Sequence, residues 1–288
     1  MDKRTLVLLA CLVFGAVTFV VIGDVAGKLL TSGGVEPFVV AWSRFLLAAA
    51  ILLPFSGLRG SAWRDLFQGL ILLRACFIAA GICCILTALK TEPIANVFGA
   101  FFVGPIVSYV LAILFLGERP SRARSLHLAV GFTGVILVVK PGFGATTGMF
   151  FAVAAGVFYG TYLALTRLAA RDYRPRFLLI SQLLIGSVLL SPLGLSGPMP
   201  SFDFATMTLI TISALGSAVG NYLLAIANRK AEASLIAPLV YSQLVSATLL
   251  GILVFGDWPD LLTLLGLLLI LASGLGSLIA HQRTQSAP

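Results

Sequence analysis

The chain has 288 residues, of which 59% are hydrophobic and 10% are charged, with 19 Lys and Arg against 11 Asp and Glu. A soluble domain has roughly 45–50% apolar and about 25% charged residues, so this chain lacks the polar surface of a water-soluble fold. The composition predicts an integral membrane protein without room for a soluble ATPase domain. The basic residues separate apolar runs, which indicates membrane topology and argues against a nucleic-acid partner.

Ten apolar stretches are predicted to cross the bilayer as helices, because about 20 apolar residues span its hydrocarbon core. In chain order they are residues 5–23, 37–57, 66–89, 93–116, 125–140, 149–166, 177–194, 204–228, 233–255 and 260–280. The fifth is the shortest, and the bilayer must thin around it or its flanking residues must snorkel. The expected fold class is an all-α integral membrane protein with ten transmembrane helices.

The loops between these stretches differ sharply in positive charge. Fourteen of the Lys and Arg residues lie on the side of the N-terminus, whereas only Lys28, Lys90 and Lys140 lie on the opposite side. Cytoplasmic loops carry the excess of Lys and Arg in membrane proteins. Both termini are therefore predicted to be cytoplasmic.

The two halves of the chain carry proline, basic and acidic residues at matching positions. Pro54 aligns with Pro192, and Lys90 and Glu92 align with Lys230 and Glu232. We expect a first five-helix repeat over residues 1–140, a linker over 141–148 and a second five-helix repeat over 149–288. An odd number of spans per repeat makes the repeats inverted, which is typical of secondary transporters with a binding site at the bilayer midplane.

Several motifs resemble the EamA family of the drug/metabolite transporter superfamily. They are Lys28 with the glycines of the first helix, Trp42-Ser43-Arg44-Phe45-Leu46-Leu47-Ala48, Phe115-Leu116-Gly117-Glu118-Arg119-Pro120, Ala237-Pro238, and Phe255-Gly256-Asp257-Trp258-Pro259. The likeness covers about residues 5–280. Asp257 stands where the family usually has Glu, and Trp258 replaces a more common polar residue.

The resemblance implies a multi-pass carrier of small organic metabolites in a bacterial inner membrane. Members of this family most often export, and amino acids or their derivatives are frequent substrates, while other members similar to riboflavin and S-adenosylmethionine transporters import. The expected partners are a small-molecule metabolite and the lipid bilayer, and the expected assembly is a monomer or a homodimer.

Polar residues inside the spans are the candidates for substrate binding, because they are costly in a bilayer and usually face the bundle interior. Arg74 is a candidate for an anionic group of the substrate, with Phe77 on the same helical face. Snorkelling of Arg74 to the cytoplasmic surface is the alternative. Arg44 is interpreted mainly as a structural residue that pairs within the bundle.

The second half supplies the other candidates. Asn221 ends a stripe with Ser213 and Ser217 at a spacing of four, beside two glycines, and suits a cavity wall or close helix packing. Tyr159 and Tyr162 lie about one turn apart, inside their span, and can offer a ring and a hydroxyl to a ligand. Further candidates, Tyr241 and Gln243, follow Pro238, whose interruption of the helix frees backbone carbonyls.

Coupling to an ion gradient has one sequence candidate, Asp24. A proton-driven carrier usually needs an acid at depth, yet all the candidate acids, Asp24 included, are predicted to lie at or near span ends. The cysteines lie in apolar runs without metal or redox spacing, so no metal, cofactor or catalytic residue is expected.

Two functions remain open from the sequence. The leading one is export of an amino acid or an amino-acid-derived compound, a metallophore among them, by alternating access. The alternative is import of a vitamin or cofactor-like metabolite such as riboflavin or S-adenosylmethionine. A membrane-embedded enzyme is disfavoured because no cluster of acids, His pairs or metal ligands is present.

Overall fold

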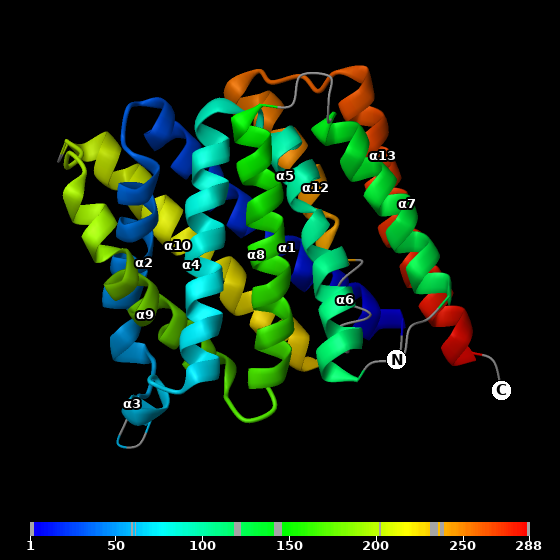
Figure 1. The fold of residues 1–288 in the computed structure, drawn as a ribbon, viewed down its shortest axis with the longest axis horizontal. Coiled ribbons are helices and arrows are strands. Elements are labelled where there is room, and N and C mark those ends of the chain that lie inside the picture. Colours follow the sequence, from blue (N-terminus) through cyan, green and yellow to red (C-terminus); the bar gives the residue numbers. More distant parts are fainter. Residues whose placement is uncertain are drawn as a thin grey trace.

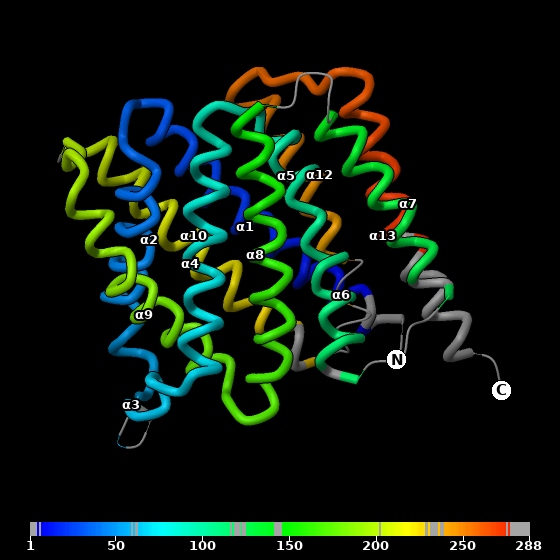
Figure 2. Tube along the Cα trace, viewed as in Figure 1, coloured from blue at the N-terminus to red at the C-terminus, as the bar shows by residue number. Residues whose placement is uncertain are grey.

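The computed structural model describes residues 3–58, 60, 62–117, 122–140, 146–201, 203–230, 236 and 239–286, and this part of the chain is helical without a β-strand (Figures 1 and 2). The first half contains α1 (Lys3–Ser32), α2 (Pro37–Leu52), η1 (Leu53–Phe55), α3 (Ala62–Asp65), α4 (Gly69–Thr91), α5 (Ile94–Phe101), α6 (Val103–Leu116) and α7 (Arg122–Val139). The second half contains α8 (Thr147–Ala169), α9 (Pro175–Ser196), α10 (Phe204–Lys230), α12 (Gln243–Leu250), the π-helical η2 (Gly251–Phe255) and α13 (Leu261–Ser286).

Seven helices of the described chain are long and apolar enough to cross a membrane, and three shorter apolar helices accompany them. The shorter ones are Ser125–Val139, Gln243–Phe255 and Leu261–Gly274. Each of these ten elements overlaps one of the ten predicted stretches. The all-α fold class is therefore confirmed.

The first helix is longer than the sequence predicts. α1 continues through Asp24 to Ser32, so Asp24 lies inside the helix and is 3% exposed. The expectation that Asp24 sits at a span end is wrong for this residue. The charged group is tolerated there because Arg44 of α2 neutralises it, and that partner lies 20 residues away in the chain.

The fourth predicted span consists of two helices. α5 ends at Phe101 and α6 begins at Val103, with Pro105 in the first turn of α6. Proline fits the first turn of a helix, since its missing N–H leaves no bond unmade there. In the ninth span α12 begins at Gln243; Pro238, like the Glu118-Arg119-Pro120 motif and Glu232, lies outside the described residues.

The main helix contacts join the two halves of the chain. α1 packs along α10, α4 along α8, α2 along α9, and α7 along α13. Figure 1 shows α4 and α8 side by side in the middle of the bundle and α7 with α13 at one edge. α1 begins and α13 ends at the same end of the bundle, where the α8–α9 turn also lies (Figure 1). The core is thus built between the halves, so neither half encloses it alone.

Small residues allow the backbones of α1 and α10 to approach closely. A Cβ added to Gly220 would lie 2.5 Å from the carbonyl oxygen of Ala16 and 2.9 Å from the amide nitrogen of Val20. At Gly216 it would lie 2.9 Å from the Phe19 carbonyl oxygen. Small-residue contacts of this kind are how spanning helices associate.

Replacing Gly220 by Val should push α10 away from α1. Overpacking of a tight core costs roughly 1–3 kcal/mol, and here the clash is with backbone that cannot rotate away. We expect a lower thermal midpoint in detergent, measured by loss of the monodisperse size-exclusion peak. Gly15→Val, on α1 where a Cβ meets nothing within 4 Å, is the matched control. Equal midpoints for the two variants would contradict the close crossing.

Candidate functional site

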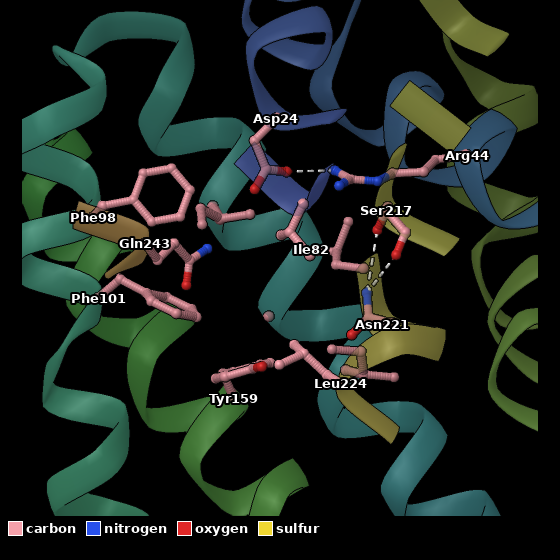
Figure 3. A pocket seen from close by; sticks show the side chains of 14 residues that line it. Asp24, Arg44, Ile82, Phe98, Phe101, Tyr159, Ser217, Asn221, Leu224 and Gln243 are labelled. Atoms are coloured by element: carbon pink, nitrogen blue, oxygen red, sulfur yellow. Dashed lines mark hydrogen bonds and ion pairs between the residues drawn. The ribbon is translucent and has the colours of Figure 1, made fainter. Parts of the chain in front are cut away.

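A cavity of about 50 Å³ lies in the bundle where helices of both halves meet (Figure 3). A water molecule needs about 10–15 Å³ of such space, so the cavity in this conformation has room for only a few waters. Its lining residues come from α1, α2, α4, α5, α8, α10 and α12: Val20, Asp24, Arg44, Ile78, Gly81, Ile82, Ile85, Phe98, Phe101, Tyr159, Ser217, Asn221, Leu224 and Gln243.

An ion pair forms one wall of the cavity. Nη1 of Arg44 donates to Oδ1 of Asp24 at 2.7 Å, and both side chains are 4% exposed. The pair joins α1 to α2 (Figure 3). Nε of Arg44 is buried and has no hydrogen-bond acceptor among the described residues. The wall therefore carries two opposite charges and one unused donor.

Amides and serines form the polar part of the remaining wall. Asn221 donates from Nδ2 to the carbonyl oxygen of Ser217 at 2.8 Å and to its Oγ at 3.4 Å. Gln243 is 5% exposed and lies near Phe98 and Phe101 in Figure 3. These amides offer donors and acceptors to a ligand without adding charge.

Aromatic rings line the side of the cavity formed by α5 and α8. The rings of Phe101 and Tyr159 are 4.9 Å apart between centroids, and those of Phe98 and Phe101 are 6.1 Å apart in an edge-on arrangement. Such rings can pack against a flat or apolar part of a ligand. The cavity thus combines an ion pair, amides and an aromatic wall.

Asp24, Tyr159, Asn221 and Gln243 are the sequence candidates that this cavity brings together. The structure places the other four elsewhere. Two of these lie in ring contacts: Phe77 faces Phe158 with centroids 6.1 Å apart, and Tyr241 stacks on Phe102 at 4.8 Å.

Arg74 lies in a closed network that joins α4 to α8 and α9. It is 1% exposed, and every nitrogen of its guanidinium has an acceptor. Nε donates to Oγ1 of Thr166 at 2.8 Å, Nη1 to the Leu178 carbonyl oxygen at 2.9 Å, and Nη2 to Oε1 of Gln182 at 2.7 Å and the Tyr162 hydroxyl at 3.3 Å. The arrangement favours a structural role for Arg74.

Tyr162 belongs to the same network. Its hydroxyl donates to Oε1 of Gln182 at 2.8 Å, and its ring lies 4.9 Å below the guanidinium carbon of Arg74. Neither Tyr162 nor Arg74 is among the residues that line the cavity. Ile78 and Gly81, on the same helix as Arg74, do line it, because they lie one and two turns further along α4.

Sequence reasoning missed the α5 side of the cavity. Phe98 and Phe101 stand three residues apart on a short helix, as aromatic residues do in many packing faces. The break at Phe102 has one signal in the sequence, Pro105, which lies in the first turn of α6. Arg44 was recognised as a paired residue, and its pairing with Asp24 is observed.

A second polar cluster lies at the end of the bundle opposite the α8–α9 turn. Lys28, one turn beyond Asp24 on α1, donates to the carbonyl oxygen of Glu92 at 2.8 Å and to Oδ2 of Asp257 at 3.0 Å. Its ammonium lies 4.6 Å from the centre of the Phe255 ring. These contacts connect α1 with the end of α4 and with the segment after η2.

Asp260 caps the start of α13 at this end. It accepts hydrogen bonds from the Lys140 ammonium and, at 3.0 Å, from the backbone N–H of Thr263, and these bonds lower the pKa of its carboxyl group. Because the folded-state pKa is lowered, the stabilisation is present above the ordinary carboxyl pKa and is lost as the pH falls through the folded-state value.

Asp260→Asn should therefore lower the thermal midpoint slightly at pH 7. An exposed pair of this kind contributes about 1 kcal/mol or less. The difference from the unchanged protein should begin to shrink as the pH falls below about 4, where the carboxyl group of the unfolded state becomes neutral, and it should disappear below the lowered folded-state pKa. Thermal scans at pH 7, 5 and 3.5 measure this. A difference that stays constant over these pH values would contradict the assignment.

No group of three or more His, Cys, Asp or Glu residues in the described chain could hold a metal ion. Asp24, the acid in the cavity wall, forms an ion pair with Arg44. The cavity wall offers a ligand charge, amide hydrogen bonds and ring packing.

The described structure is that of a multi-pass membrane protein with a polar and aromatic cavity between its halves. The sequence matches the EamA-like transporter family twice, over residues 7–140 and 146–279, and the chain belongs to this family of membrane transporters. As in the family, the protein is a multi-pass protein of the bacterial inner membrane. The two matched segments correspond to the two halves whose helices pack against each other.

Three bacterial relatives illustrate the family. The chain is 27% identical to a riboflavin transporter of Rhizobium johnstonii over 86% of this chain and 83% of that protein. It is 25% identical to an S-adenosylmethionine uptake transporter of Rickettsia felis, over 91% and 90%. A Helicobacter pylori protein described as an uncharacterized transporter is 28% identical, over 59% of this chain and 60% of that protein.

A solved crystal structure has the same fold. It superposes with a TM-score of 0.71 and covers 99% of this chain and 100% of that chain, at 18% sequence identity. At this identity the likeness concerns the fold alone.

Proposed function

We propose that this protein is a secondary transporter that carries a small organic metabolite with a planar ring across the bacterial inner membrane. The observation that carries the proposal is the cavity between the two family segments, which combines the Phe101 and Tyr159 rings with the Asn221 and Gln243 amides. Riboflavin and S-adenosylmethionine, which name two of the relatives, each contain a flat ring system with hydrogen-bonding groups. Uptake is the direction that these relatives favour.

We further propose ten membrane-spanning segments with both termini in the cytoplasm, as two inverted repeats over residues 1–140 and 149–288. The seven long and three shorter apolar helices together supply ten crossings. The start of α1 and the end of α13 lie at the same end of the bundle, which fits an even number of crossings. A monomer or a homodimer suffices for this design, since one chain supplies all the residues that line the cavity.

Alternating access then requires contacts between the repeats to open at one end while they hold at the other. The Lys28 cluster with Asp257 and Glu92 joins the repeats at one end, and the Arg74 network joins them at the other.

Export of an amino acid or an amino-acid-derived compound, a metallophore among them, is the second candidate. The observation that favours it is the ion pair of Asp24 and Arg44 in the cavity wall, which is complementary to ammonium and carboxylate groups. Asp24 is in this view the residue that couples transport to charge movement.

The test is transport in cells that lack their own riboflavin synthesis, with the gene expressed or deleted. Growth on micromolar riboflavin, or accumulation of labelled S-adenosylmethionine in the cells, supports uptake. An amino-acid-derived metabolite that accumulates in the medium on expression, without uptake of either compound, supports export. If expression changes neither the cellular nor the extracellular metabolites, the transporter assignment for this cavity is wrong.

A matched pair of variants on α8 links the transport to the cavity. Tyr159→Ala removes a ring from the cavity wall, and we expect at least a tenfold loss of transport efficiency. Phe150→Ala removes a ring that is 71% exposed on the outside of the same helix, and it should transport normally. Equal transport by both variants would contradict the location of the site.

A further inference from the structure

Lys28 makes contacts on both sides of the boundary between the two family segments. Its ammonium donates to the carbonyl oxygen of Glu92, in the first segment, at 2.8 Å, and to Oδ2 of Asp257, in the second segment, at 3.0 Å. It also lies 4.6 Å from the centre of the Phe255 ring, which belongs to the second segment. The contacts to Asp257 and Phe255 therefore join the two segments, whereas the contact to Glu92 stays within the first.

These contacts lie directly beyond the cavity along α1. Asp24 lines the cavity, and Lys28 follows it on the same helical face, about 6 Å further along the helix axis. Lys28 belongs to the last turns of α1, which ends opposite the chain termini (Figure 1). In the proposed topology this is the periplasmic end. A ligand that follows this face of α1 between the cavity and the periplasm passes Lys28.

The backbone before Asp257 departs from a regular α-helix. Residues Gly251–Phe255 form the π-helical η2, whose hydrogen bonds span one residue more than those of an α-helix. Gly256 then adopts a left-handed conformation with φ at 69°, which residues with a side chain rarely adopt. Single π-helical turns within longer helices are frequent at functional sites. The ninth span thus ends in an irregular turn that places Asp257 beside Lys28.

The contacts of Lys28 can open at a lower cost than the network around Arg74. The side chains of Lys28 and Asp257 are 10% and 29% exposed, so water can solvate the two charges when they separate. Arg74 is 1% exposed, and its guanidinium makes four hydrogen bonds. Breaking these bonds would leave a buried charge without partners. Opening is therefore expected at the Lys28 end while the Arg74 network holds.

We infer that Lys28, Asp257 and Phe255 form the periplasmic gate of the cavity. While the ion pair is intact, the end of the ninth span is held against α1 and the cavity is closed toward the periplasm. Separation of Lys28 from Asp257 releases the irregular turn, and water entering from the periplasm solvates both charges. The inference rests on the proposed function, because it names the residues that control access to the same cavity from one side.

The experiment measures access to the cavity with a cysteine reporter, so it needs no substrate. Ile82→Cys places a thiol in the cavity wall of the full-length protein, in which the four native cysteines are replaced by alanine. A membrane-impermeant maleimide is added to spheroplasts, which expose the periplasmic face, or to inverted vesicles, which expose the cytoplasmic face. Ser201→Cys in the α9–α10 connection and Arg171→Cys in the α8–α9 turn, both exposed positions, report the orientation.

Asp257→Asn and Lys28→Met should each raise the labelling rate from the periplasmic face about fivefold or more and lower it from the cytoplasmic face, since a partly exposed ion pair shifts a two-state equilibrium by roughly this factor. Asp257→Glu keeps the charge and should label as slowly as the unchanged protein. Lys90→Met is the matched control, because Lys90 pairs with Glu36 at 3.6 Å at the same end but within the first segment. Asp257→Asn decides the test if Lys28→Met fails to fold.

Equal labelling rates for Asp257→Asn and the unchanged protein would overturn the gate and leave the proposed function standing. Faster labelling from both faces would also overturn it, because a loosened bundle behaves in that way and a released gate does not. An Ile82→Cys reporter that is labelled from neither face in any variant overturns the gate and the proposed function together. If labelling shifts as expected but no metabolite is transported, the gate stands and the proposed substrate is wrong.

Discussion

Arg74→Met is expected to destabilise the protein by about 3 kcal/mol or more, because it removes a fully buried guanidinium that makes four hydrogen bonds between α4, α8 and α9. Methionine fills much of the volume but leaves Gln182 and Thr166 without this donor. The measurement is the thermal midpoint of the purified protein, followed by size-exclusion chromatography after heating.

Arg64→Met is the control, because Arg64 is exposed on α3 and the change should stay within about 0.5 kcal/mol. An Arg74→Met protein with the normal midpoint and no ligand binding would contradict the structural role. That result would favour instead the substrate contact that the sequence suggested for Arg74.

Removing one member of the pair of Asp24 and Arg44 is expected to cost about 3–5 kcal/mol, because the remaining charge is left buried and unpaired. Asp24→Leu and Arg44→Leu should each show this loss. The double variant should be more stable than the sum of the single effects predicts, since it buries no charge. All three variants should lose transport if the pair binds the substrate.

A double-mutant cycle on thermal or chemical unfolding measures the coupling between the two residues. Its control is Lys28→Leu combined with Arg44→Leu, because no hydrogen bond or ion pair is described between Lys28 and Arg44. A coupling near zero for Asp24 and Arg44 would show that the pair does not stabilise the fold.

The stripe of glycine and serine residues on α10 shows what the sequence predicts and what only the tertiary structure decides. The spacing of Ser213, Ser217 and Asn221 predicted either a cavity wall or close packing, and the structure contains both. A Cβ at Gly23 would lie 2.9 Å from the Ser217 amide nitrogen and 3.0 Å from the Ser213 carbonyl oxygen, so this face packs on α1. Ser217 and Asn221 also reach the cavity.

Arg44 and Arg74 show more clearly what cannot be predicted from the sequence. Both were visible as costly residues inside apolar spans, but the sequence ranked Arg74 above Arg44 as the substrate contact. Hydrogen-bond partners decide between them, and those of Arg74 lie more than 80 residues away on α8 and α9. No local pattern reports such partners, because side chains on different helices meet only through packing.

The sequence by itself determined the membrane class, the ten apolar segments and the family-like motifs, because hydropathy, charge and turn residues act locally along the chain. The tertiary structure decided which polar residues share the cavity. In the folded protein α1 continues past Asp24, that acid pairs with Arg44, and a closed hydrogen-bond network surrounds Arg74. The physical reason is that a buried charge is tolerated only beside its partner, and the partner is set by which helices pack together.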